Sequence, residues 1–183
     1  MLKDIIQDLG DSIKIMFGDE SFFRSETTVT HTWGDIKERK LIQVASHRGT
    51  VAVIGAVDPI KGDHFEIVTQ GVDSEVFKVF LKHLSLKYSK EQILLILDNA
   101  SFHKTQGSDK YPLPDNIHIL YLPPYSPDMN PQENVWKTVK ESEFKNVLCK
   151  DVDELFTTVV RAFQKYQNRK FKYDSPINKL TKH

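Results

Sequence analysis

The segment 93–100, "ILLILDNA", decides the fold of this chain. Five consecutive apolar residues end in Asp98 and Asn99. An unbroken apolar run of this length suits a strand that is covered on both faces, as the central strands of α/β sheets are. The run therefore predicts a central strand, and it places Asp98 at the strand end where such sheets usually present their ligands.

Before this run, short segments with the apolar and polar pattern of β-strands follow one another. Residues 12–23 place Asp19 on the same face as three apolar side chains. Further strands are predicted around 41–44, over 51–57 and over 63–71, with short turns between them. Consecutive strands with short connections indicate an antiparallel meander.

From Asp73 onward the apolar residues are spaced three and four positions apart, as in amphipathic helices. Asp73 is predicted to cap a helix with three-four apolar spacing, and a helical or irregular piece follows His103. Residues 116–122 predict another strand and 131–146 another helix. The last helix carries an amphipathic stripe: Val152, Leu155, Phe156, Val159, Val160 and Phe163. The order β-β-β-α-β-α-β-α-α predicts an α/β fold, a mixed five-stranded sheet with helices on both faces.

Composition supports a single domain over residues 1–183. The chain is 39% hydrophobic, enough for one core, and its 25 basic and 25 acidic residues balance. The stretch from Lys165 to His183 is basic, which suits either phosphate contacts or a solvated terminus. A single cysteine, Cys149, excludes a disulfide framework and a cysteine-based zinc site. Without a membrane-length apolar run or a signal-peptide pattern, we expect a soluble intracellular protein.

Three acids far apart in the sequence are candidates for one site. A strand–helix–strand crossover tends to set the new strand beside and parallel to an earlier one, which would make Asp98 a neighbour of Asp19. Two adjacent carboxylates repel each other, and a divalent cation such as Mg²⁺ relieves this. Glu133 follows the proline-rich stretch 122–131 and would complete a site for two ions, the arrangement that serves displacement at phosphorus.

Each acid also has a structural interpretation. Residues 130–133 fit a capping box, and Glu133 is spaced to pair with Lys137 across one helical turn. Asp98 fits a plain turn at a strand end. Asp19 is the least ordinary of the three, because carboxylates are depleted in strands.

Three segments together resemble the catalytic domain of mariner-superfamily transposases, in particular their bacterial insertion-sequence branch. They are "FGDESFF" (17–23), "LLILDNASFHK" (94–104) and "YLPPYSPDMNPQENVWKTVKE" (121–141). The 34 residues between Asp98 and Glu133 are the separation characteristic of that branch. "THTWG" and "GTVAVIGAVD" also look like the family's stretch between the first and second acids, so the resemblance extends over about 13–165.

The resemblance implies a ribonuclease-H-like fold and a DDE triad of Asp19, Asp98 and Glu133 that binds two Mg²⁺ ions, with Mn²⁺ as a substitute. It implies cleavage of transposon ends and attack of the freed 3′-hydroxyl on target DNA at a deformable TA step. A homodimer in a synaptic complex and a bacterial cytoplasmic, nucleoid-associated location are further expectations. Family members usually carry an N-terminal helix-turn-helix DNA-binding region, whereas the first strand is expected here by about residue 12. We therefore expect an isolated domain, or a frame whose DNA-recognition part is a separate upstream product.

Several residues near the acids are secondary candidates. Possible DNA contacts, which also suit a solvated or structural role, are His103, Lys104, Lys137 and Lys140. Asn99 and Asn130 are supporting residues, the first near the metal ligands and the second at the start of the helix. Gln132 departs from the aliphatic residue common in the family, and Trp33 and Trp136 suit the core better than base stacking.

Two rival functions remain open at this point. One is a different ribonuclease-H-fold nuclease, acting on Holliday junctions or RNA–DNA hybrids; the proline motif and the acid spacing disfavour it. The other is an inactive or domesticated DNA-binding remnant, and the presence of all three acids disfavours that.

Overall fold

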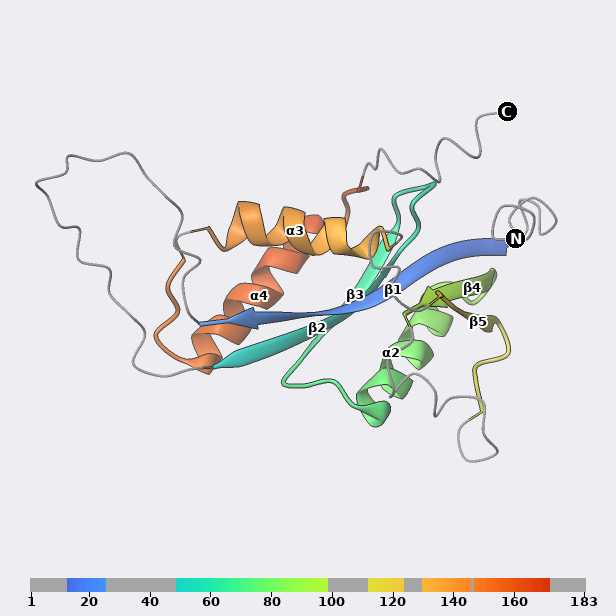
Figure 1. The fold of residues 1–183 in the computed structure, drawn as a ribbon, viewed down its shortest axis with the longest axis horizontal. Helices are drawn as coiled ribbons and strands as arrows, with labels where there is room; N and C mark the ends of the chain where they lie inside the picture. The colour runs from blue at the N-terminus through green and yellow to red at the C-terminus, as the bar shows by residue number, and fades with distance from the viewer. Residues whose placement is uncertain (1–12, 26–48, 99–111, 124–129, 146, 172–183) are drawn as a thin grey trace, which may run out of the picture.

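The computed structural model describes residues 13–25, 49–98, 112–123, 130–145 and 147–171 (Figure 1). Its elements are β1 (Ile13–Arg24), β2 (Thr50–Val57), β3 (His64–Thr69), α2 (Ser74–Lys87), β4 (Gln92–Leu97), β5 (Ile117–Tyr121), α3 (Gln132–Glu143) and α4 (Val152–Tyr166). The predicted strand around 41–44 and the piece after His103 lie outside the described residues. None of the helices within these described ranges is long and apolar enough to cross a membrane.

The five strands form one mixed sheet in the order β3-β2-β1-β4-β5. The first three pair antiparallel, and β4 and β5 continue the sheet parallel to β1. This confirms the predicted meander followed by strand–helix alternation. The apolar run of β4 lies between β1 and β5, and its residues from Ile93 to Leu97 are buried. It is an interior strand with buried side chains on both faces, as the unbroken apolar pattern predicted.

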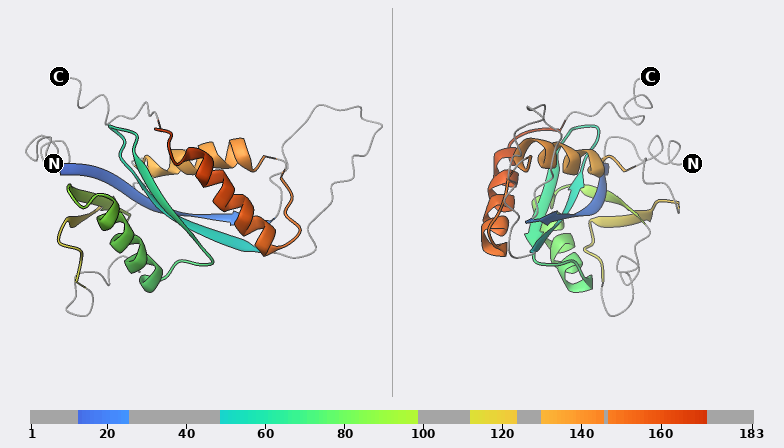
Figure 2. Two further views of the ribbon diagram at one scale, coloured as in Figure 1. Left: turned by 180° about the vertical axis from the view of Figure 1, so that it is seen from behind. Right: turned by 60° about the vertical axis from the view of Figure 1, so that its left-hand side comes forward.

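Helices cover both faces of the sheet, α3 and α4 on one side and α2 on the other (Figures 1 and 2). Successive side chains of β2 point to opposite faces of the sheet and so pack against both helix layers. Val51 and Val53 pack with α3 and α4, whereas Ile54 and Ala56 pack with the buried face of α2. Because every residue of β2 after Thr50 is buried, the strand reads as a nearly continuous apolar run.

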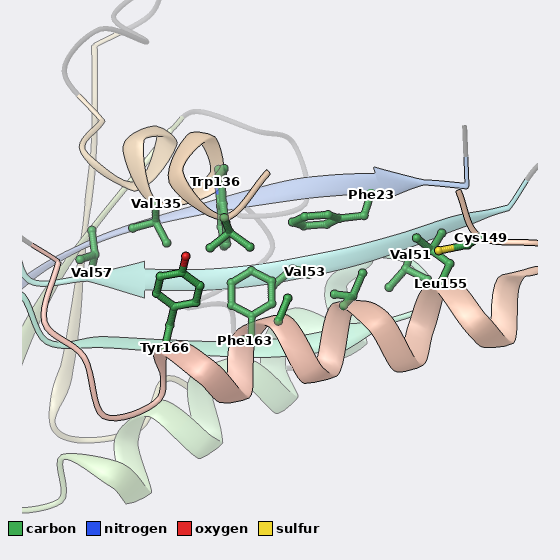
Figure 3. Close-up of a cluster of buried hydrophobic side chains, with 13 residues drawn as sticks. Phe23, Val51, Val53, Val57, Val135, Trp136, Cys149, Leu155, Phe163 and Tyr166 are labelled. Carbon is green, nitrogen blue, oxygen red and sulfur yellow. The ribbon is translucent and has the colours of Figure 1, made fainter. Parts of the chain in front are cut away.

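The larger core lies under α3 and α4 (Figure 3). Leu155, Val159 and Phe163 of the predicted α4 stripe are buried there, and the edge of the Phe163 ring meets Phe23 at 5.9 Å between centroids. Each such side chain contributes about 1.5–3 kcal/mol by leaving water. The stripe therefore fixes which side of α4 meets the sheet.

Side-chain caps define where α2 and α4 begin. Asp73 accepts hydrogen bonds from the amides of Glu75 and Val76, as predicted for α2. Asp151 accepts from the amide of Glu154 at the start of α4. Both caps follow from short sequence patterns, because a cap satisfies amide groups only two or three residues away.

His64 ties the edge strand β3 to the end of α4. Its Nε2 lies 2.9 Å from the carbonyl oxygen of Tyr166 and 3.0 Å from that of Arg169, and its Nδ1 lies 2.7 Å from Glu66 Oε1. All these partners are acceptors, so the ring bonds them best when both nitrogens carry protons. Burial lowers the pKa of His64, but the Glu66 carboxylate and the two carbonyl groups outweigh it and raise the pKa above the ordinary value.

Candidate active site

The pairing of β1 with β4 sets two of the three candidate acids side by side. Phe17 pairs with Ile96 in parallel register, and the same offset carried two residues further sets Asp19 opposite Asp98. Asp98 directly follows the last residue of β4. The chain passes from β3 through α2 into β4, which lies beside and parallel to the earlier strand β1, as predicted.

Asp19 lies in an environment that opposes its negative charge. Its pKa is raised to about 7, first by burial and then by the charge of Glu20, with Asp98 adding to the effect. A hydrogen bond from Trp136 works in the opposite direction and lowers the pKa of Asp19. A carboxylate crowded by two other acids is a group whose charge a bound cation would stabilise.

The start of α3 is attached to β1 next to Asp19. Asn130 donates from Nδ2 to the carbonyl oxygen of Gly18 at 3.1 Å, and its Oδ1 accepts from the backbone N–H of Gln132 at 3.1 Å. The helix begins at Gln132, one residue later than the capping-box pattern predicts, and Pro131 precedes it without a side-chain cap. Asn130 therefore both caps the helix and joins it to the strand that carries the first acid.

A second attachment comes one turn later from Trp136. Its indole Nε1 donates to Asp19 Oδ2 at 2.9 Å, while the ring packs in the core under α3 (Figure 3). The backbone beneath the ring is Gly55, which pairs with Asp19 across the sheet. A Cβ on Gly55 would lie 2.7 Å from Trp136 Cη2, so only glycine leaves room for the helix here.

The sequence pattern predicts Trp136 in the core and marks no role for Gly55. Trp136 is indeed buried, but its indole N–H also bonds to a candidate metal ligand. The available signal was the spacing, because a residue three positions after Glu133 lies on nearly the same side of the helix.

Glu133 lies between these two attachments, exposed in the first turn of α3. Lys140 follows it by seven residues, which returns to nearly the same helical stripe. The ammonium group of Lys140 lies 5.1 Å from the Phe23 ring centre. Burial lowers the pKa of Lys140, while the charge of Asp19 opposes this shift. The stripe that carries Glu133 therefore runs along the side of α3 that is near β1.

The structure brings the aspartates together without completing a three-acid cluster. Among the described residues, no group of three or more His, Cys, Asp or Glu lies close enough to hold a metal ion. That Glu133 shares a metal site with Asp19 and Asp98 stays a prediction. Asn99, His103 and Lys104 lie outside the described residues, as does Trp33, and Lys137 is an exposed residue of α3.

The donors that are present suit a hard divalent cation. Mg²⁺ and Mn²⁺ prefer carboxylate oxygens, and Asp19 and Asp98 supply them from adjacent strands. The pKa of Asp19 is raised chiefly by burial and by the charge of Glu20, with a further contribution from Asp98, and a bound cation would offset this penalty on its negative charge. The residues thus fit a divalent metal ion, with Glu133 in the first turn of α3 as a further candidate ligand.

A mixed sheet of this order, with Asp19 within β1, Asp98 directly after β4 and α3 docked beside β1, defines a ribonuclease-H-like fold. The chain belongs to the DDE superfamily endonuclease family, whose model matches residues 14–156. It is 34% identical over 121 residues to the uncharacterized protein y4pE/y4sA of Sinorhizobium fredii, with 66% of this chain and 87% of that protein covered.

Two transposon proteins are also similar. The Tc3 transposase of Caenorhabditis elegans is 29% identical over 133 residues, covering 67% of this chain and 40% of that protein. The insertion element IS630 39 kDa protein of Shigella sonnei is 28% identical over 125 residues, covering 67% of this chain and 33% of that protein. The chain thus spans less than half the length of these two relatives.

Solved structures show the same fold. The Mos1 mariner paired-end complex with Mn matches with a TM-score of 0.60 at 12% identity, covering 90% of this chain and 52% of that chain. At this identity the match concerns the fold. It agrees with the predicted ribonuclease-H-like architecture and with the family assignment.

Proposed function

We propose that this catalytic domain cuts and joins DNA strands as a transposase, with divalent metal ions bound by Asp19, Asp98 and Glu133. One observation carries the proposal: β1 and β4 pair in parallel, and their register, continued past Phe17 and Ile96, puts Asp19 of β1 opposite Asp98 just after the end of β4. The hydrogen bond from Asn130 to Gly18 brings the first turn of α3 to the same place.

The metal ions, Mg²⁺ or Mn²⁺, would supply activation of the attacking oxygen and stabilisation of the leaving oxygen at phosphorus. The similar Mos1 paired-end complex is a complex with Mn, which supports this choice of metal. Asp19 and Asp98 would hold the ions from the rigid sheet. Glu133 would add its carboxylate from α3, whose placement the bonds of Asn130 and Trp136 hold.

Three further side chains of α3 would orient the metal ligands and the DNA. Trp136 holds one oxygen of Asp19 by a hydrogen bond and so fixes the direction of this carboxylate. Lys137 and Lys140, on the same stripe as Glu133, would contact DNA phosphates beyond the metal site. Transposon ends and target DNA are the proposed substrates, since the related structures are transposase complexes with paired ends.

A metal-dependent nicking assay tests the proposal. We expect the protein to nick plasmid DNA with Mg²⁺ or Mn²⁺ and to lose this activity with EDTA. Asp98→Asn and Glu133→Gln should each lower the rate at least a hundredfold. Glu141→Gln is the matched control, because Glu141 is an exposed acid on the same helix outside the proposed site.

The same assay separates the rival functions. Preference for branched DNA or for RNA–DNA hybrids over duplex DNA would favour a different nuclease of this fold. Activity that survives both Asp98→Asn and Glu133→Gln would refute the proposed metal site. Metal-dependent binding of DNA without any cleavage would favour an inactive DNA-binding remnant.

A further inference from the structure

Gln132, the residue immediately before Glu133, buries a side-chain amide for which the described part of the chain offers no hydrogen-bond partner. Its side chain is fully buried, and neither Nε2 nor Oε1 has a hydrogen-bond partner in the described part of the chain. Burying an amide unpaired is unfavourable, and native proteins rarely do so without a reason. An apolar side chain of the same length would fill this space at lower cost.

The side-chain amide of Gln132 lies against a row of three paired residues that crosses the sheet, Asp19 of β1, Gly55 of β2 and Glu66 of β3. Gly55 pairs with Asp19 on one side and with Glu66 on the other. Gln132 Nε2 and Glu66 Cγ both lie 2.9 Å from the position that a Cβ on Gly55 would occupy. Two acids thus flank Gly55, and the amide of Gln132 lies close to the second of them.

Helix α3 directs two N–H donors toward this row from positions four residues apart, which share one side of a helix. The first donor, Trp136, bonds to Asp19 at 2.9 Å. The second, Gln132, has no hydrogen-bond partner among the described residues, although Glu66 is near. The Glu66 carboxylate contacts His64 Nδ1 at 2.7 and 2.9 Å, and its oxygens retain further lone pairs that can accept from an amide.

We propose that Gln132 is a positioning residue for Glu133: its amide donates to the Glu66 carboxylate when α3 settles on the sheet in the metal-bound state. The two bonds, Trp136 to Asp19 and Gln132 to Glu66, would then hold the helix on both sides of Gly55. Since Glu133 is the next residue, a fixed Gln132 fixes the direction of the third proposed metal ligand. The inference rests on the proposed metal site.

The test compares metal-free stability with metal affinity. Gln132→Met keeps the length of the side chain and removes its hydrogen-bonding atoms. We expect this variant to raise the metal-free melting temperature by about 2–4 °C, because an unpaired buried amide is lost. We expect the same variant to weaken Mn²⁺ binding about tenfold, measured by the Mn²⁺-induced rise in melting temperature.

Two further variants test whether Glu66 is the partner of Gln132 and whether damage to the core alone changes Mn²⁺ affinity. Glu66→Met should also weaken Mn²⁺ binding, and adding Gln132→Met to it should produce no further loss. Val139→Ala is the control for core damage in α3, since Val139 is buried in the same helix away from the row. It should lower the melting temperature and leave Mn²⁺ affinity unchanged.

The possible outcomes separate the two proposals. Unchanged Mn²⁺ affinity in Gln132→Met would overturn the positioning role and leave the metal site intact. A lower metal-free melting temperature in that variant would show that the amide is already paired, which also overturns it. If the wild-type protein shows no Mn²⁺ effect while remaining folded, the proposed metal site fails and the positioning role fails with it.

Discussion

Replacing Asp19 by Asn is expected to stabilise the metal-free protein at neutral pH. The pKa of Asp19 is raised from 3.8 to about 7 in the folded state, chiefly by burial. Between these values the folded protein binds more protons than the unfolded chain, so the free energy of unfolding falls as pH rises from about 4 to about 7. Above this range the loss is complete. Asn carries no charge and avoids the loss, and its carbonyl oxygen can still accept from Trp136.

The magnitude follows from the size of the shift. Each pKa unit corresponds to about 1.4 kcal/mol, so a shift from 3.8 to about 7 sets an upper limit of about 4 kcal/mol. Asp19 is only half-buried, and water screens part of its interaction with Glu20 and Asp98. We therefore expect a gain of about 2 kcal/mol at pH 8, or a rise of about 4–8 °C in melting temperature.

The measurement is urea denaturation of wild type and Asp19→Asn in EDTA at pH 4 and pH 8. The variant should be more stable at pH 8 and nearly equal to wild type at pH 4, where the folded wild type is protonated as well. Asp115→Asn, at an exposed turn before β5, is the control and should behave as wild type at both pH values. A gain of equal size at both pH values, or a loss at pH 8, would refute the electrostatic reasoning.

Three further predictions concern the attachments around the site. Asn130→Ala removes the bond to Gly18 and the cap of α3, and should lower the free energy of unfolding by about 1–2 kcal/mol in urea denaturation; an unchanged midpoint would mean that other contacts hold the helix start. Gly55→Ala places a Cβ 2.7 Å from Trp136 Cη2 and should cost about 1–3 kcal/mol by the same measurement, whereas a neutral result would show that α3 shifts freely. The raised pKa of His64 means that its contribution is complete below its ordinary pKa and is lost as pH rises through the folded value. The stability gap between wild type and His64→Gln should therefore shrink from pH 6 to pH 9, and a widening gap would contradict the assignment.

Much of the fold could be predicted because its signals are local. The unbroken apolar run of β4 predicted a strand covered on both faces, and Asp73 predicted the start of α2. The neighbouring placement of Asp19 and Asp98 required one topological rule, the crossover to a parallel strand. Helix α3 begins one residue later than the capping-box pattern predicts, and Asn130 still accepts from the backbone N–H of Gln132 while it donates to Gly18 of β1.

The sequence by itself determined the order of the elements, the identity of the candidate acids and the family, because periodicity, caps and motif spacing act within a few residues or survive as a linear pattern. Only the tertiary structure decided how α3 lies on the sheet. The bonds of Asn130 to Gly18 and of Trp136 to Asp19 join residues more than a hundred positions apart. Such contacts depend on the rotation and height of a packed helix, which side-chain packing sets and no local pattern encodes. The same packing buries the side-chain amide of Gln132, next to Glu133, at a place where none of the described residues bonds to it.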